Sequence, residues 1–173
     1  MKFEIKQKEL MKALSIANRA VSKATNIQIH ELIYFSVEND RLSLTSFDGE
    51  ISIKTLADAK IIEEGVMAVK ADLITNIIRK LPDELVKIEL ESGKIKISCK
   101  RSNFNLVAFE YFEKEEMKNP INDPLSIDND KLKRSISQTE FATTLDETKL
   151  ALTGILFELR EGSLNMVALD GYR

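Results

Sequence analysis

The chain has 173 residues, of which 43% are hydrophobic and 31% charged, and its net charge is −3. This composition is typical of a globular protein with a hydrophobic core. No apolar run is long enough to span a membrane, and the charged N-terminal residues do not resemble a signal peptide, so we expect a cytoplasmic protein. With one histidine and one cysteine, we expect no metal site, no cofactor and no internal disulfide.

The sequence lacks the spaced motifs of the common enzyme classes. It has no phosphate-binding loop, no dinucleotide fingerprint, no H-E-x-x-H and no G-x-S-x-G. A histidine-paired nucleophile would depend on His30, whose neighbours predict the start of a strand. We therefore expect a non-catalytic protein. An enzyme with an unrecognised carboxylate site stays open as an alternative, and it would need acidic residues clustered in a cleft.

The spacing of hydrophobic residues predicts the first elements of the chain. A strand at residues 2–5 precedes a helix in which Leu10, Leu14, Ala17 and Val21 share one face. Alternating residues then predict strands at 32–37, 42–45 and 51–56, with a turn at 38–40 between the first two.

The same order of elements then recurs. The predicted strands of this second half lie at residues 66–69, 86–90, 95–99 and 104–108, with a hairpin turn at 91–94. A helix at 72–81 lies between the first two, and Leu73, Ile77 and Leu81 are its predicted buried stripe. Two β-α-β-β-β halves predict an α+β fold in which the helices cover one face of antiparallel sheets.

An internal repeat extends beyond these two halves. A shift of 122 residues superposes the apolar positions of residues 3–14 and 33–49 on later ones, and it places Asp48-Gly49 on Asp170-Gly171. Two unrelated alternating strands would match in part by chance. One register kept across both blocks favours a true repeat.

The repeat predicts the domain organisation. The first domain is expected at residues 1–122, with a linker at about 117–124 that holds two of the three prolines. Residues 123–173 are then the N-terminal portion of a second, truncated domain. In the first domain a further strand follows the Asp-Gly pair, so we expect the chain to be the N-terminal fragment of a longer protein.

Positive charge is concentrated in three predicted helical segments. Residues 6–23, 70–82 and 130–138 hold 11 basic and 3 acidic residues, a net charge of +8, whereas the rest of the chain totals −11. Lysines on one helix usually only solvate its surface. Arg79 and Lys80 would also interact favourably with the partial negative charge at the C-terminal end of their helix. Three such segments predict a basic surface, almost without acidic partners, that holds duplex DNA by its phosphates, since no aromatic residue for base stacking lies in them. The residues predicted to contact DNA are Lys8, Lys12, Arg19, Lys23, Arg79, Lys80, Lys131 and Arg134.

Short motifs along the whole chain resemble those of one family. They are Met1-Lys2-Phe3, Leu42-Ser43-Leu44-Thr45 with Asp48, Ile78-Arg79-Lys80-Leu81-Pro82, Arg101-Ser102-Asn103-Phe104, Gly154-Ile155-Leu156-Phe157-Glu158 and Val167-Ala168-Leu169-Asp170-Gly171-Tyr172-Arg173. In their order and spacing they resemble the bacterial sliding clamp family, the beta subunit of DNA polymerase III. The resemblance implies three domains per protomer and a head-to-tail homodimer that closes a ring around duplex DNA. The rest of the second domain and the third domain are then absent from this chain.

The resemblance also implies roles for residues outside the helices. It places part of a groove for partner peptides at Leu152, Leu169, Gly171, Tyr172 and Arg173, and part of the dimer interface at Arg101, Phe104 and Leu106. Asp170 is expected to be structural. The implied partners are the DNA polymerase III alpha subunit, the clamp loader and other clamp-binding proteins. Two departures from the family are Thr25-Asn26-Ile27-Gln28-Ile29-His30, where Thr-Leu-Pro-Ile-Leu is common, and Tyr172, where histidine is usual.

Two functions of different kinds remain after this comparison. The first is a DNA sliding clamp, a processivity factor that encircles duplex DNA and tethers the replicative polymerase. The alternative is a stand-alone clamp-like adaptor or decoy, which binds the same proteins without encircling DNA.

Overall fold

The computed structural model describes residues 1–22, 26–109 and 125–172, and the chain divides into two compact units, Met1–Glu116 and Met117–Arg173. The predicted domain boundary at residue 122 and the predicted linker at about 117–124 lie outside the described residues. None of the helices in the described ranges is long and apolar enough to cross a membrane.

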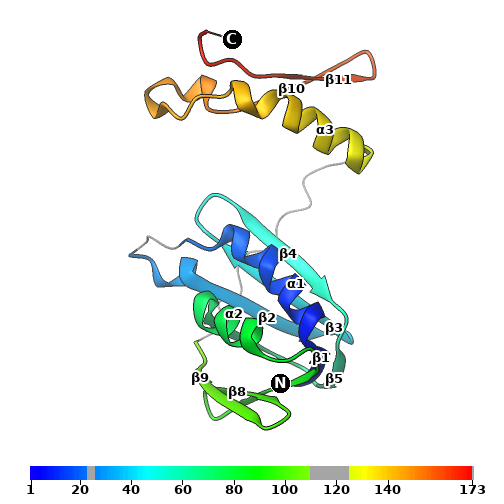
Figure 1. Ribbon diagram of the computed structural model, residues 1–173, viewed down its shortest axis with the longest axis vertical. Coiled ribbons are helices and arrows are strands. Elements are labelled where there is room, and N and C mark those ends of the chain that lie inside the picture. Colours follow the sequence, from blue (N-terminus) through cyan, green and yellow to red (C-terminus); the bar gives the residue numbers. More distant parts are fainter. Residues whose placement is uncertain (23–25, 110–124, 173) are drawn as a thin grey trace. The chain divides into compact units, whose positions relative to one another are not determined.

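Unit 1 consists of two sheets and the helices that cover them (Figure 1). Its helices are α1 (Gln7–Ala17), η1 (Asn18–Ala20), η2 (Gln28–Glu31) and α2 (Ala71–Lys80). Its strands are β1 (Lys2–Lys6), β2 (Leu32–Glu38), β3 (Arg41–Phe47), β4 (Ser52–Ala57), β5 (Lys60–Glu63), β6 (Gly65–Lys70), β7 (Leu85–Glu91), β8 (Lys94–Cys99) and β9 (Ser102–Val107). The predicted α+β fold with antiparallel sheets is confirmed. Strand β5 was not predicted, because its two adjacent isoleucines show no alternation.

The two halves of unit 1 exchange their first strands. One sheet has the order β5-β1-β7-β8-β9 and the other the order β4-β3-β2-β6, so β1 joins the strands of the second half and β6 joins those of the first. Both exchanged strands pair antiparallel, with Phe3 opposite Ile88 in one sheet and Met67 opposite Phe35 in the other. Neither half therefore completes its sheet without the other.

The core of unit 1 lies where the two sheets and the two long helices meet. Phe3 and Phe35 come from different sheets, are fully buried, and stack with their ring centroids 6.4 Å apart. Leu10 and Leu14 of α1 and Ile78 of α2 are also fully buried in this core. Burial of these apolar side chains is the main force that holds the sheets and helices together.

The buried stripe of α2 differs from the predicted one. Ile74 and Ile78 are fully buried, whereas Leu73 is 50% exposed and Ile77 is half-buried. Both Leu73 with Ile77 and Ile74 with Ile78 are spaced four residues apart, so the sequence alone offered two stripes. The second stripe faces the core, and the buried Thr75 next to it accepts from Nδ2 of Asn18, the first residue of η1, at 2.8 Å.

Helix α1 ends earlier than predicted. It ends at Ala17, a 3₁₀ turn follows, and Val21 has extended backbone angles (φ −114°, ψ 123°). The buried Ser46 hydroxyl donates to the Ala17 carbonyl oxygen at 2.5 Å and so satisfies one of the carbonyl groups at the helix end. Residues 28–31, where we predicted the start of a strand, form the 3₁₀ helix η2 instead.

Unit 2 repeats α1, η1, β2 and β3 of unit 1 in the predicted register, whereas residues 125–128, which correspond to residues 3–6 of β1, form no strand. Its described elements are α3 (Asn129–Thr139), η3 (Glu140–Ala142), η4 (Glu147–Leu152), β10 (Leu156–Arg160) and β11 (Ser163–Val167). Helix α3 begins and ends 122 residues after α1. The hairpin turns also correspond, since Asn39 and Asp40 have φ of 50° and 57° while Glu161 and Gly162 have φ of 49° and 78°.

The Asp-Gly pairs of the two units form the same kind of turn. Asp48 Oδ1 accepts from the backbone N–H groups of Ile51 and Glu50 at 2.8 and 3.0 Å, and these bonds lower the pKa of Asp48. Asp170 Oδ1 accepts from the Tyr172 N–H at 2.8 Å in the same way. Both aspartates therefore hold the backbone of a turn.

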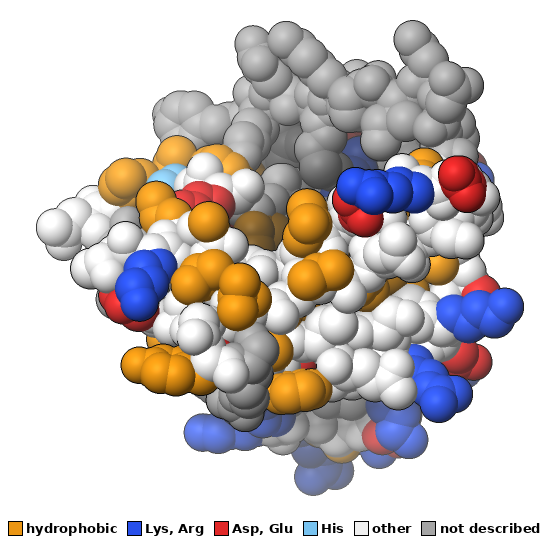
Figure 2. Space-filling view, turned by 90° about the horizontal axis from the view of Figure 1, so that it is seen from above, with side chains coloured by type: hydrophobic (Ala, Val, Ile, Leu, Met, Phe, Trp, Pro, Cys, Tyr) orange, Lys and Arg blue, Asp and Glu red, His pale blue; other side chains and the backbone are white. Residues whose placement is uncertain are grey.

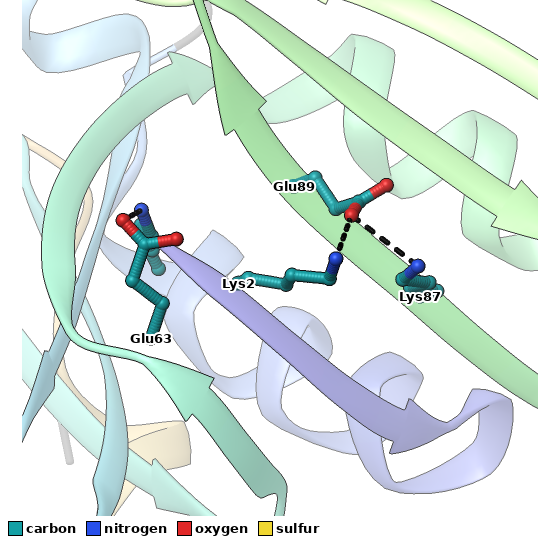
Figure 3. Close-up of polar contacts among 5 residues, drawn as sticks. Lys2, Glu63, Lys87 and Glu89 are labelled. Carbon is teal, nitrogen blue, oxygen red and sulfur yellow. Dashed lines mark ion pairs between the residues drawn. The ribbon is translucent and has the colours of Figure 1, made fainter.

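Ion pairs link neighbouring strands on the surface of the five-stranded sheet (Figure 3). Glu89 Oε1 lies 2.6 Å from Lys2 Nζ and 3.3 Å from Lys87 Nζ, and the Met1 amino group lies 3.2 Å from Glu63 Oε1. The bond to Lys2 lowers the pKa of Glu89, and the bond to Glu89 raises the pKa of Lys2. The contribution of Glu89 to stability is therefore present above its ordinary pKa of 4.5 and is lost as the pH falls through the lowered value.

Candidate nucleic-acid interface

The exposed faces of α1, η1 and α2 carry the predicted basic residues of unit 1. The side chains of Lys8 and Lys12 lie on the exposed face of α1, Arg19 is exposed in η1, and Arg79 and Lys80 are exposed in the last turn of α2. Most apolar residues of both helices turn towards the core, although Ile16 and Leu73 are exposed. Lysine and arginine on an exposed helix face can bind phosphate oxygens.

Side-chain hydrogen bonds hold α1 and α2 side by side (Figure 1). The buried Gln7 Nε2 donates to the Ile78 carbonyl oxygen at 2.7 Å near one end of the pair. Asn18 Nδ2 donates to Thr75 Oγ1 and to the Leu14 carbonyl oxygen, each at 2.8 Å. The two basic helix faces are therefore parts of one rigid surface.

Lys8 has an acidic partner, contrary to our prediction for this face. Its Nζ lies 2.6 Å from Asp83 Oδ2, and this bond raises the pKa of Lys8. Lys70, which we had counted with the basic segments, is likewise paired with Glu31 at 3.1 Å. Sequence reasoning missed Asp83 because it lies 75 residues from Lys8 and meets it only where the α2–β7 loop returns to the start of α1.

Four other predicted cations of unit 1 make no ion pair with another described residue. Within residues 1–22 and 26–109, the following side chains make no ion pair: Lys12, Arg19, Arg79 and Lys80. Lys23 lies outside the described residues. Four exposed cations on packed helical segments, none of them paired with another described residue, favour a polyanion.

Helix α3 presents a similar basic face in unit 2. Asp128 caps the helix, since its Oδ1 accepts from the N–H groups of Asp130 and Lys131 at 3.1 and 3.0 Å. Lys131 and Arg134 are exposed, and neither makes an ion pair with another described residue. Arg134 follows Lys12 by the repeat length of 122 residues and occupies the same position in its helix.

The residues predicted for a partner-peptide groove lie at the surface of unit 2. Tyr172 is 97% exposed, Leu169 is 47% exposed and Leu152 is half-buried at the end of η4. Gly171 has a φ of +93°, which favours glycine, and Arg173 lies outside the described residues. A contiguous patch of exposed apolar side chains marks a binding surface, whereas single exposed side chains are normal.

Other hydrophobic side chains of unit 2 are exposed as well. Figure 2 shows hydrophobic side chains on the face turned to the viewer, and the most exposed in this unit include Leu145, Leu150 and Leu156. A depression of about 500 Å³ lies between α3 and the β10–β11 hairpin, lined in part by Thr139, Leu164 and Met166. None of the four described groove residues, Leu152, Leu169, Gly171 and Tyr172, lines it.

The residues predicted for a dimer interface lie at the edge strand β9. Within the described residues β9 pairs along its length with β8 alone, and Phe104 and Leu106 lie opposite the buried Ile97 and Ile95. Leu106 packs against the core, whereas Phe104 is 37% exposed and Arg101 is exposed before the strand. An edge strand offers unpaired backbone groups to another chain. Phe104 and Arg101 are the more accessible of the three.

Comparison with solved structures gives close matches to this fold. A DNA polymerase sliding clamp from Bacillus subtilis matches with a TM-score of 0.90 and 29% identity, over 98% of this chain and 47% of its own. A DNA polymerase III beta subunit from Caulobacter crescentus matches with a TM-score of 0.89 and 31% identity, over 99% of this chain and 48% of its own.

Comparison with curated sequences agrees with these structures. The chain is 32% identical to the beta sliding clamp of Pseudomonas aeruginosa over 180 residues and 27% identical to that of Micrococcus luteus over 176 residues. Both alignments include all of this chain, which spans 48% and 56% of the two relatives, or about half their length.

Family models cover nearly all of the described residues. Residues 1–118 match the DNA polymerase III beta subunit, N-terminal domain, and residues 126–173 match the central domain of the same subunit. These matches agree with the exchanged-strand fold of unit 1 and with the repeated elements of unit 2. The chain belongs to the DNA polymerase III beta subunit family.

Proposed function

We propose that the protein carrying this chain is a DNA sliding clamp, a processivity factor that encircles duplex DNA during replication. The observation that carries the proposal is the surface of α1 and α2, on which Lys12, Arg79 and Lys80 are exposed and have no acidic partner within the described residues. Family membership supports the same function. The proposed role is non-catalytic, and the cytoplasm is its proposed location because bacterial DNA is replicated there.

The surface is suited to hold DNA without reading its sequence. Lysine and arginine contact phosphates, which repeat along the duplex and carry no base information. Contacts of this kind do not fix the protein at one position, so it can move along DNA. A ring that slides keeps a bound polymerase near its template, which raises the polymerase's effective concentration there.

Closure of a ring requires a second protomer. We infer that the edge strand β9, with Arg101, Phe104 and Leu106, belongs to the interface of a homodimer. The unpaired edge of β9 and the partial exposure of Phe104 support this assignment. The proposed protein partners are the DNA polymerase III alpha subunit, the clamp loader and other clamp-binding proteins.

Encirclement can be tested by comparing DNA with and without free ends. We expect the protein as the cell makes it, once loaded by its clamp loader on a nicked circular duplex, to stay bound through gel filtration. It should leave the same DNA after a restriction enzyme makes it linear, because a sliding ring escapes at an end. Equal retention on both forms would contradict encirclement, and no retention on either would favour the adaptor.

The partner-peptide groove is a separate part of the proposal. Replacing Leu169 and Tyr172 by alanine should weaken binding of a peptide from the polymerase alpha subunit by at least tenfold, since buried aromatic anchors at interfaces are often worth about 2 kcal/mol. Fluorescence anisotropy of a labelled peptide measures the change. Leu145→Ala is a matched control, because Leu145 is 97% exposed in the same unit and is not a predicted groove residue. Unchanged affinity in the double variant would remove these residues from the groove.

A further inference from the structure

The ion pair between Lys8 and Asp83 divides the basic surface of unit 1. Lys8 Nζ lies 2.6 Å from Asp83 Oδ2, whereas Lys12, one turn further along α1, has no ion-pair partner among the described residues. We propose that Asp83 keeps Lys8 from contacting DNA phosphates, so that the DNA-binding face of α1 begins at Lys12. This inference rests on the proposed function and identifies a residue that limits the strength of DNA binding.

The loop that carries Asp83 is fixed at the start of α1. The Gln7 N–H donates to the Glu84 carbonyl oxygen at 3.0 Å, and the Glu84 N–H donates to the Pro82 carbonyl oxygen at 2.8 Å. The Glu84 carboxylate is itself paired with Lys100 at 2.6 Å. Asp83 therefore has little freedom to move away from α1.

The two charged groups of this pair differ in how freely they can move. Asp83 is short and lies on a fixed loop, whereas Lys8 has a long, flexible side chain that is 75% exposed. The position of the negative charge is thus more fixed than that of the positive charge.

The fixed position of the Asp83 carboxylate determines how the ion pair affects DNA binding. An exposed ion pair is weak by itself, so a phosphate could displace Asp83 from Lys8 if charge attraction to Lys8 were the only force. A phosphate that reaches Lys8 would, however, lie beside the fixed Asp83 carboxylate, and these two negative charges would repel each other. Lys8 then adds little to the number of phosphates that the protein neutralises.

The salt dependence of DNA binding measures directly how many phosphates the protein neutralises. Each neutralised phosphate adds about 0.9 to the slope of log affinity against log salt concentration on duplex DNA. In the protein as the cell makes it, we expect Lys8→Gln to leave this slope unchanged. Asp83→Asn should raise the slope by about one, because Lys8 becomes free to bind phosphate. The probe is a fluorescently labelled duplex, and the readout is anisotropy across a salt series.

Two further variants separate this effect from a general change in charge. Asp72→Asn removes the same charge from an exposed residue of α2 that makes no ion pair within the described ranges, and we expect it to leave the slope unchanged. Lys8→Gln combined with Asp83→Asn should restore the original slope.

The possible outcomes distinguish this inference from the proposed function. A fall of about one in the slope of Lys8→Gln would overturn the role of Asp83, as would equal slopes for Asp83→Asn and Asp72→Asn. If Lys12→Gln also leaves the slope unchanged, the surface of α1 does not bind DNA and the proposed function loses its carrying observation. If the slope falls in Lys12→Gln and stays unchanged in Lys8→Gln, the result supports both the role of Asp83 and the proposed function.

Discussion

Replacing Lys12 and Arg19 together by glutamine is expected to lower the salt dependence of DNA binding by about two in log–log slope. Both side chains are exposed and lack an ion-pair partner within the described residues, so their whole charge is available to phosphates. Binding at a given salt concentration should weaken to the same degree for any duplex sequence, because phosphate contacts carry no base information. Anisotropy with two duplexes of unrelated sequence measures both effects.

The matched control removes two positive charges elsewhere in unit 1. Lys54 on β4 and Lys96 on β8 are exposed sheet residues outside the predicted DNA-binding surface. Replacing both by glutamine should leave the slope near its original value. Equal losses in the two double variants would mean that net charge, and not the helix surface, governs binding. Thermal unfolding should be nearly the same for both, since all four side chains are at the surface.

Replacing Phe35 by alanine is expected to have the largest effect on stability, a loss of about 3–5 kcal/mol in the free energy of unfolding. Phe35 is fully buried on β2 and stacks on Phe3 of β1, which belongs to the other sheet. The substitution leaves a cavity where the two sheets meet, and the surrounding side chains cannot collapse to fill it. A loss of this size approaches the whole stability of a small domain. Chemical denaturation followed by circular dichroism measures it.

An exposed residue of the same sheet provides the control for Phe35. Leu56 on the edge strand β4 is 60% exposed, and Leu56→Ala should change the free energy of unfolding by about 0.5 kcal/mol or less. If Phe35→Ala cost less than about 1 kcal/mol, the stacked pair would not be the centre of the core.

Family membership and the physical reading of the residues support each other for this chain. The net charge of −3 conceals a basic helix surface, and that surface is what a protein sliding on phosphates needs. The alternation of β and α segments in two halves predicts helices on sheets but is common to many α+β folds. The repeat narrows the choice, because α3 and its 3₁₀ turn follow α1 and η1 in the same register.

Local features could be predicted because they depend on neighbouring residues. The hairpin turns at Asn39-Asp40 and Ser92-Gly93 have positive φ, which Asn, Asp and Gly favour. The Asp-Gly turns are similar, since a short carboxylate bonds to the backbone two residues on. The exposed positions of Lys12 and Arg134 follow from helix periodicity and the repeat. For these features the sequence contained nearly all the information required.

The remaining features depend on residues that are distant in the chain. Alternation determines which face of a strand is buried but not which strand lies beside it, so the exchange of β1 and β6 could not be predicted. Helix α2 offered two equally spaced stripes, and packing against α1 chose Ile74 and Ile78. Asp83 meets Lys8 only because the α2–β7 loop returns to the start of α1. The sequence by itself determined most of the elements, the repeat and the basic helix faces, because these depend on local spacing. Only the tertiary structure decided which strands pair and which cations remain unpaired, because those contacts join residues that the fold brings together.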